Sequence, residues 1–167
     1  MKGRAGALAV EMVFVLASVI WLKEWVFPFF ISQWFPQADT ASQMLEWILL
    51  VIGVITCFIY VGLGSSAWNH HGLKAGPSLG VFLVIHLPLL LPVALSAVPG
   101  TAFTDAWSGL IGDGLRLFNP ARWTFHPVTL GVITCLLFLL GRRIRVTERE
   151  PRRFRGMNRG RKVWEKP

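Results

Sequence analysis

The sequence predicts an all-α integral membrane protein, built as a four-transmembrane-helix bundle with both termini in the cytoplasm. Hydrophobic residues make up 53% of its 167 positions and charged residues only 16%. Soluble domains carry about 25% charged residues, so this composition is typical of a protein that faces lipid. Four apolar stretches are long enough to cross a hydrocarbon core, which takes about 20 helical residues. Lys and Arg are also distributed unevenly among the segments that join these stretches.

The four apolar stretches cover residues 5–30, 45–64, 77–98 and 123–141. The first follows the basic start MKGR, as a secretory signal would. It is too long for a signal, however, and it is interrupted by Glu11 and followed by no small-x-small cleavage site. We therefore expect it to be a retained first helix.

The orientation follows from the basic residues that flank the spans. Lys2 and Arg4 precede the first span, and Lys74 lies between the second and the third. The segment 31–43, between the first two spans, contains neither Lys nor Arg. Because Lys and Arg are retained on the inner side, we expect a multi-pass protein of the cytoplasmic membrane, with both termini inside.

A basic tail follows the last span. We expect a transmembrane domain over residues 1–141 and a cytoplasmic tail over 142–167, which is largely disordered because of its dense like charge. The tail holds eleven Lys and Arg against three Glu. Anionic lipid headgroups are its expected partner, at about 1 kcal/mol per cation near the surface. An acidic soluble partner remains open, and nucleic acid is disfavoured because the tail contains no recognised RNA-binding motif. The candidate contact residues are Arg142, Arg143, Arg145, Arg149, Arg152, Arg153 and Arg155.

The second outer loop contains the stretch FTDAWSGLIGDGLRLF, residues 103–118. Its apolar residues recur at helical spacing, and Thr104 or Asp105 can cap its start. We expect a short interfacial helix that packs as a lid over the bundle, with a gate or a partner-docking surface as the alternative.

The pentapeptide GVITC occurs at residues 53–57 and again at 131–135, in the second and fourth spans. Small residues four positions apart let two helices approach closely. Neither cysteine has metal-ligand spacing, so we expect both to be free thiols that act as small apolar groups. The predicted helix-packing residues are Gly53, Cys57, Tyr60, Gly64, Gly131 and Cys135.

Two ionisable residues, Glu11 and His86, lie inside predicted spans at similar depths. Pro88 and Pro92 should kink the third helix beside His86 and open space there. One hypothesis is that Glu11 and His86 meet and form a proton-carrying or ligand-binding site. The alternative is that His86 is a neutral core residue bonded to a backbone carbonyl, while Glu11 reaches the cytoplasmic interface.

These features favour a non-catalytic accessory, assembly or oligomer-forming subunit, whose partners are the lipid bilayer and a second copy or another membrane protein. The alternative is a small transporter or channel component that uses the Glu11–His86 pair. A haem-binding protein or a membrane enzyme comes third. Haem between helices needs two facing histidines, but His126 lies near the outer end of its span, and His70 and His71 lie in a loop. The sequence assigns no catalytic residue, cofactor or metal site.

Overall fold

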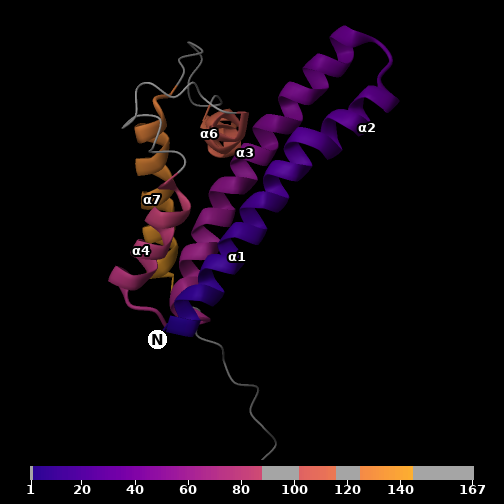
Figure 1. The fold of residues 1–167 in the computed structure, drawn as a ribbon. Coiled ribbons are helices and arrows are strands. Elements are labelled where there is room, and N and C mark those ends of the chain that lie inside the picture. Colours follow the sequence, from indigo (N-terminus) through magenta and orange to yellow (C-terminus); the bar gives the residue numbers. More distant parts are fainter. Residues whose placement is uncertain (1, 88–101, 116–124, 145–167) are drawn as a thin grey trace, which may run out of the picture.

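The computed structural model describes residues 2–87, 102–115 and 125–144 (Figure 1). Of these residues 90% are helical and none lies in a strand, which confirms the all-α prediction. The elements in chain order are α1 (Lys2–Trp21), the π-helical turn η1 (Leu22–Val26), α2 (Phe27–Trp34), α3 (Ala38–Asn69), α4 (Ala75–Ile85), α6 (Ala102–Leu115) and α7 (Pro127–Arg143).

Two long helical segments form a hairpin at the start of the chain. Gly3–Trp34 and Ala38–Asn69 each contain 32 residues and are long and apolar enough to span a membrane. At 1.5 Å per residue each is about 48 Å long, more than the hydrocarbon core requires. Most of the predicted loop 31–43 is therefore helical, so the first two helices are longer than the predicted spans 5–30 and 45–64. Pro36 sets the remaining break, because a residue before proline avoids the α conformation and Phe35 is extended at φ −121° and ψ 91°.

The π-helical turn η1 interrupts the first long helix just before Pro28. The N–H of Phe27 donates to the carbonyl of Leu22, five residues earlier. Pro28 has no N–H and its ring crowds the preceding turn, which favours a local departure from α geometry. Within the turn Lys23 is buried, whereas Leu22 and Trp25 are exposed.

The helices α3 and α7 run in the same direction and pack closely (Figure 1). Gly64 of α3 lies against the backbone of Phe138, and Gly141 of α7 lies against the backbone of Val61. A Cβ atom at either glycine would overlap a carbonyl oxygen. Small residues thus permit the close approach of these two helices, as expected for α3. On α7 the contact lies at Gly141, which the sequence analysis did not single out.

The helix predicted within residues 103–118 is confirmed as α6. Figure 1 shows α6 nearly end-on, whereas α1, α3 and α7 run lengthwise, so α6 crosses the other helices. Its Gly114 lies against the backbone of Gly53 in α3. It also contacts α1 and α7. The helix therefore fills the wedge between the hairpin and α7, consistent with a lid packed on the bundle.

The helix α4 is shorter than the predicted third span and ends at Ile85, with His86 as its C-cap. Pro88 and Pro92, which were expected to kink this helix, lie outside the described residues. The fourth predicted span corresponds to α7, which begins at Pro127 rather than at residue 123 and continues through Arg143.

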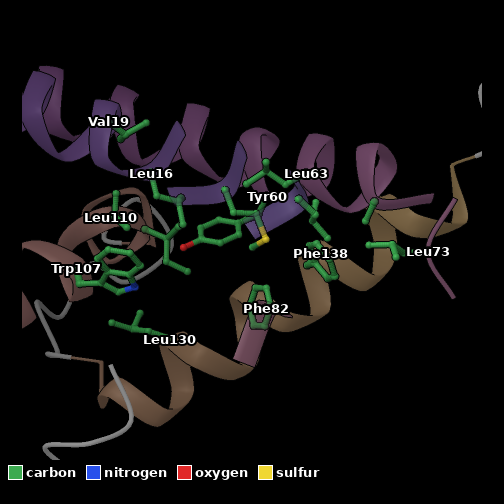
Figure 2. Packing of buried hydrophobic residues seen from close by; sticks show 14 residues of the cluster. Leu16, Val19, Tyr60, Leu63, Leu73, Phe82, Trp107, Leu110, Leu130 and Phe138 are labelled. Atoms are coloured by element: carbon green, nitrogen blue, oxygen red, sulfur yellow. The ribbon is translucent and has the colours of Figure 1, made fainter. Parts of the chain in front are cut away.

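Apolar side chains occur both between the helices and on the outside of the molecule. The enclosed ones form one cluster, which Figure 2 shows around Tyr60, Phe82 and Phe138. On the outside, Phe14 and Trp25 are each 72% exposed. Soluble proteins seldom leave many large apolar side chains in contact with water. Lys23, Asp113 and His86 are meanwhile buried, so charged and polar groups lie inside.

Replacement of Gly64 by Ala should destabilise the protein by about 1–3 kcal/mol, because the new Cβ would overlap the backbone of Phe138. Gly62→Ala is the matched control, since nothing lies within 4 Å of a Cβ at that position. Thermal unfolding in detergent, followed by circular dichroism, measures the difference. Equal stabilities of the two variants would contradict the close α3–α7 contact.

Candidate functional site

His86 is enclosed and forms hydrogen bonds through both ring nitrogens. Its side chain is 1% exposed, with Nε2 at 2.9 Å from the Tyr60 hydroxyl and Nδ1 at 2.9 Å from the carbonyl oxygen of Phe82. A carbonyl can only accept, so Nδ1 must donate to it. In the neutral ring, Nε2 then accepts a hydrogen bond from the Tyr60 hydroxyl. The predicted bond between His86 and a backbone carbonyl is confirmed.

Aromatic rings from α4 itself and from α6 enclose this Tyr60–His86 pair. Phe82 of α4 stacks on the imidazole with 4.0 Å between ring centroids. Trp107 of α6 meets the imidazole edge-on at 5.9 Å. Tyr60 also meets Phe82 edge-on at 6.3 Å, within the cluster shown in Figure 2. The pair thus joins α3 to the end of α4 and lies directly beside α6.

Glu11 lies at the end of the molecule that contains the N-terminus and the α3–α4 loop. One carboxylate oxygen is 2.7 Å from Nε2 of His71, and the hydroxyl of Ser66 donates to the carboxylate at 2.9 and 3.1 Å. The side chains of Glu11 and His71 are 35% and 17% exposed. The structure therefore gives Glu11 and His86 different partners and does not bring them together. Depth along a helix indicates the level of a residue but not the face on which it lies.

Lys23 and Asp113 form a buried charged pair that the sequence analysis did not identify. The ammonium of Lys23 in η1 is 2.6 Å from a carboxylate oxygen of Asp113 in α6, and their side chains are 9% and 12% exposed. Gly109 leaves room for the ammonium, because a Cβ there would overlap Nζ. A lysine inside the predicted span 5–30 is itself a signal of a functional or paired residue. Its partner was missed because Asp113 was assigned to an outer loop.

The predicted small-residue faces serve contacts within this chain. Gly53 packs on α6 and Gly64 packs on α7. Cys57 and Cys135 are free thiols, half-buried against the apolar core. Gly131 accepts a hydrogen bond from Thr134 within α7 through its carbonyl oxygen. The close contacts at Gly53 and Gly64 leave those positions unavailable to a second chain.

Arg142 binds within the protein instead of extending toward lipid. Its guanidinium donates to the Ser78 hydroxyl at 2.5 Å and to the carbonyl of Leu73 at 3.0 Å, and it lies 5.8 Å from the Trp68 ring. This corrects its expected role, because α7 continues past the predicted end of the span. Arg143 is exposed. The other candidate contacts of the tail, Arg145, Arg149, Arg152, Arg153 and Arg155, lie outside the described residues.

These internal bonds limit which of the described side chains can bind a metal ion or haem. In the described ranges no three His, Cys, Asp or Glu side chains lie close enough to share a metal ion. Both nitrogens of His86 are engaged by Tyr60 and Phe82, so haem ligation by His86 would have to break one of these bonds.

Double-mutant cycles should separate the two histidine sites. Tyr60→Phe leaves Nε2 of His86 without its donor and should cost about 1–3 kcal/mol of unfolding free energy. Tyr60→Phe combined with His86→Ala should cost less than the sum, since the two residues share a bond. Glu11→Ala and His86→Ala should be additive. Unfolding in mixed micelles measures all of these variants, and coupling between Glu11 and His86 above about 0.5 kcal/mol would contradict their separation.

The described residues thus contain a buried Tyr60–His86 pair, a buried Lys23–Asp113 pair and a half-buried Glu11–His71 pair. Comparison with protein-family models, with curated proteins and with solved structures finds no match for this chain.

Proposed function

We propose that this protein resides in the cytoplasmic membrane and crosses it four times, with both termini inside. The positions of apolar and charged side chains support this proposal, because they are the reverse of those in a soluble protein. Large apolar side chains such as Phe14, Trp25 and Phe58 cover the outside, while Lys23 and Asp113 are paired inside. Hydrocarbon would surround the first group at little cost, whereas water would not. The third crossing in this proposal corresponds to the predicted span 77–98.

The charges at the two ends of the molecule support the orientation. Arg4 lies at the start of α1, Lys74 in the α3–α4 loop and Arg143 at the end of α7. These element ends lie together at one end of the molecule (Figure 1). Asp39 and Glu46 lie toward the opposite end, at the start of α3. Basic residues accumulate on the cytoplasmic side of membrane proteins, so the first end is assigned to the cytoplasm.

Within the membrane, the protein acts as a non-catalytic accessory, assembly or oligomer-forming subunit. The observation that carries this role is that, among the residues the structure describes, the buried charged, hydroxyl and imidazole side chains are bonded within the chain. Lys23 binds Asp113 and His86 binds Tyr60, while the hydroxyls of Thr56 and Thr134 and of Ser78 donate to carbonyls of their own helices. A catalytic group needs access to a substrate. Partners would contact the outer apolar surface and the basic tail, since Gly53 and Gly64 are used internally.

A transporter or channel component is the second candidate, and the Lys23–Asp113 pair favours it. Ionisable residues inside a membrane are rare and often mark an ion or substrate pathway. The pair takes the place that the sequence analysis gave to Glu11 and His86. Ion flux in proteoliposomes that is lost in Asp113→Asn would establish this function in place of the accessory role.

Thiol labelling in intact cells tests the proposed threading. Single cysteines at Ser42 and Thr101, in a background without Cys57 and Cys135, should react with a membrane-impermeant reagent added outside. A cysteine at Gly160 should react only after the cells are opened, because the tail is cytoplasmic. Labelling of Gly160 in intact cells would contradict both the orientation and the lipid-binding role of the tail.

Shortening the tail tests its proposed contact with anionic lipid. A chain that ends at Glu148 lacks eight of the eleven basic residues of the tail but keeps Arg142, Arg143 and Arg145. It should insert and fold normally, yet lose binding to vesicles that contain phosphatidylglycerol. The protein in phosphatidylcholine nanodiscs is mixed with such vesicles, and co-flotation is measured at rising salt. Binding of the full chain should weaken with salt, because exposed charges are screened; salt-independent binding would contradict the electrostatic contact.

A further inference from the structure

The contacts that attach α6 to the rest of the protein include two kinds. Most are apolar or van der Waals contacts, including the backbone approach of Gly114 to Gly53 and the burial of Leu110 and Ile111. The other kind is the ion pair between Asp113 and Lys23. In a bilayer or a micelle, hydrocarbon chains can replace apolar neighbours but cannot replace a charged partner. The ion pair therefore contributes specificity to the position of α6.

The same helix covers the Tyr60–His86 pair. Trp107 of α6 lies with its indole ring at 5.9 Å from the imidazole of His86. Phe82 covers the imidazole by stacking, and Tyr60 occupies its Nε2. Removal of Trp107 with α6 would uncover the imidazole on the side that the indole now faces, so that water and small reagents could compete with the Tyr60 hydroxyl for Nε2.

The local structure of both partners suits a contact that can form and break. Lys23 is carried on the π-helical turn η1, and such turns occur often at functional sites. Its ammonium lies near the C-terminal end of α6, where the helix dipole is negative and favours a cation. Gly109 admits the ammonium, and Gly112 and Gly114 lower the intrinsic stability of α6 as a helix. A helix of this composition depends on its contacts to remain docked.

We propose that α6 is a lid over the buried Tyr60–His86 pair and that the Lys23–Asp113 ion pair is its latch. With the latch closed, Trp107 seals His86 inside the bundle. When the latch opens, α6 moves away from η1 and exposes the imidazole of His86, while the α3–α7 contact at Gly64 and Gly141 holds the rest of the bundle together. The importance of the ion pair relative to the apolar contacts of α6 rests on the membrane location proposed above. The labelling of Ser42 and Gly160 reports on that location independently, so the latch and the location can fail separately.

Two alanine variants of α6 test the latch without changing any charge. Gly109→Ala places a Cβ where the Lys23 ammonium now lies, whereas Gly112→Ala places one 3.8 Å from Leu130, an ordinary contact distance. Both changes raise helix propensity equally, so their difference isolates the latch. Lys23→Met removes the cation directly, and Lys74→Met is its control at the exposed start of α4.

The readout is modification of histidines by diethyl pyrocarbonate in the purified protein, followed by peptide mass spectrometry. His86 should be protected in the unchanged protein, and exposed His126 serves as the internal reference. Gly109→Ala and Lys23→Met should each raise the rate at His86 by about tenfold or more, while Gly112→Ala and Lys74→Met should not. Reaction of the native thiols Cys57 and Cys135 reports on general loosening and should remain slow in every variant.

An unchanged rate at His86 in Gly109→Ala and Lys23→Met would overturn the latch. A rise at His86 that is matched by faster reaction of Cys57 and Cys135 would overturn it as well, because the ion pair would then stabilise the whole bundle rather than the lid. If Lys23→Met fails to fold, Asp113→Asn takes its place, because it removes the opposite charge and keeps the shape of the side chain. An exchange of the two charges, Lys23→Asp with Asp113→Lys, should restore protection of His86, and failure of this folded variant to do so would also count against the latch.

Discussion

The structure depends on one constraint, which is that a polar group surrounded by apolar material must find its partner inside the chain. Water cannot compensate an isolated charge or donor there, so each unpaired group would cost several kcal/mol. The pairing of Lys23 with Asp113 and of Tyr60 with His86 meets this requirement. The first pair joins η1 to α6, which are distant in the sequence, and the second joins α3 to the end of α4. The polar contacts therefore specify which helices are neighbours, while the apolar contacts add packing without much selectivity.

Glycine residues also determine which helices are neighbours. At Gly53, Gly64 and Gly141, helix backbones touch directly, which brings the long α3 against both α6 and α7. Dispersion forces act over short distances, so close backbones gain contacts that larger side chains would prevent. The helix α3 thus forms the centre of the described structure. Arg142 adds a polar connection from the end of α7 to the carbonyl of Leu73 in the α3–α4 loop.

Hydropathy and the spacing of apolar residues allowed the helices to be predicted, including α6. The lengths of the first two spans were underestimated; in the second, a hydropathy window stops at Asp39 and Glu46 although the helix continues through them. The partner of a charged residue depends on which face it occupies and on how helices cross, and neither follows from spacing alone. Glu11 was therefore matched with His86 by depth instead of with its actual partner His71. Lys23 was overlooked because its partner lies on the crossing helix α6.

The distance in sequence between Gly64 and Gly141 has a consequence for synthesis. Roughly 80 residues separate the two contact points, and a ribosome adds about 5–20 residues per second. In the proposed membrane location, the hairpin of α1 to α3 therefore waits several seconds before α7 can cover Gly64. The bond of Glu11 to His71 joins α1 to the α3–α4 loop and is available early. During this interval the nascent chain offers neighbouring proteins a contact surface that disappears once α7 arrives.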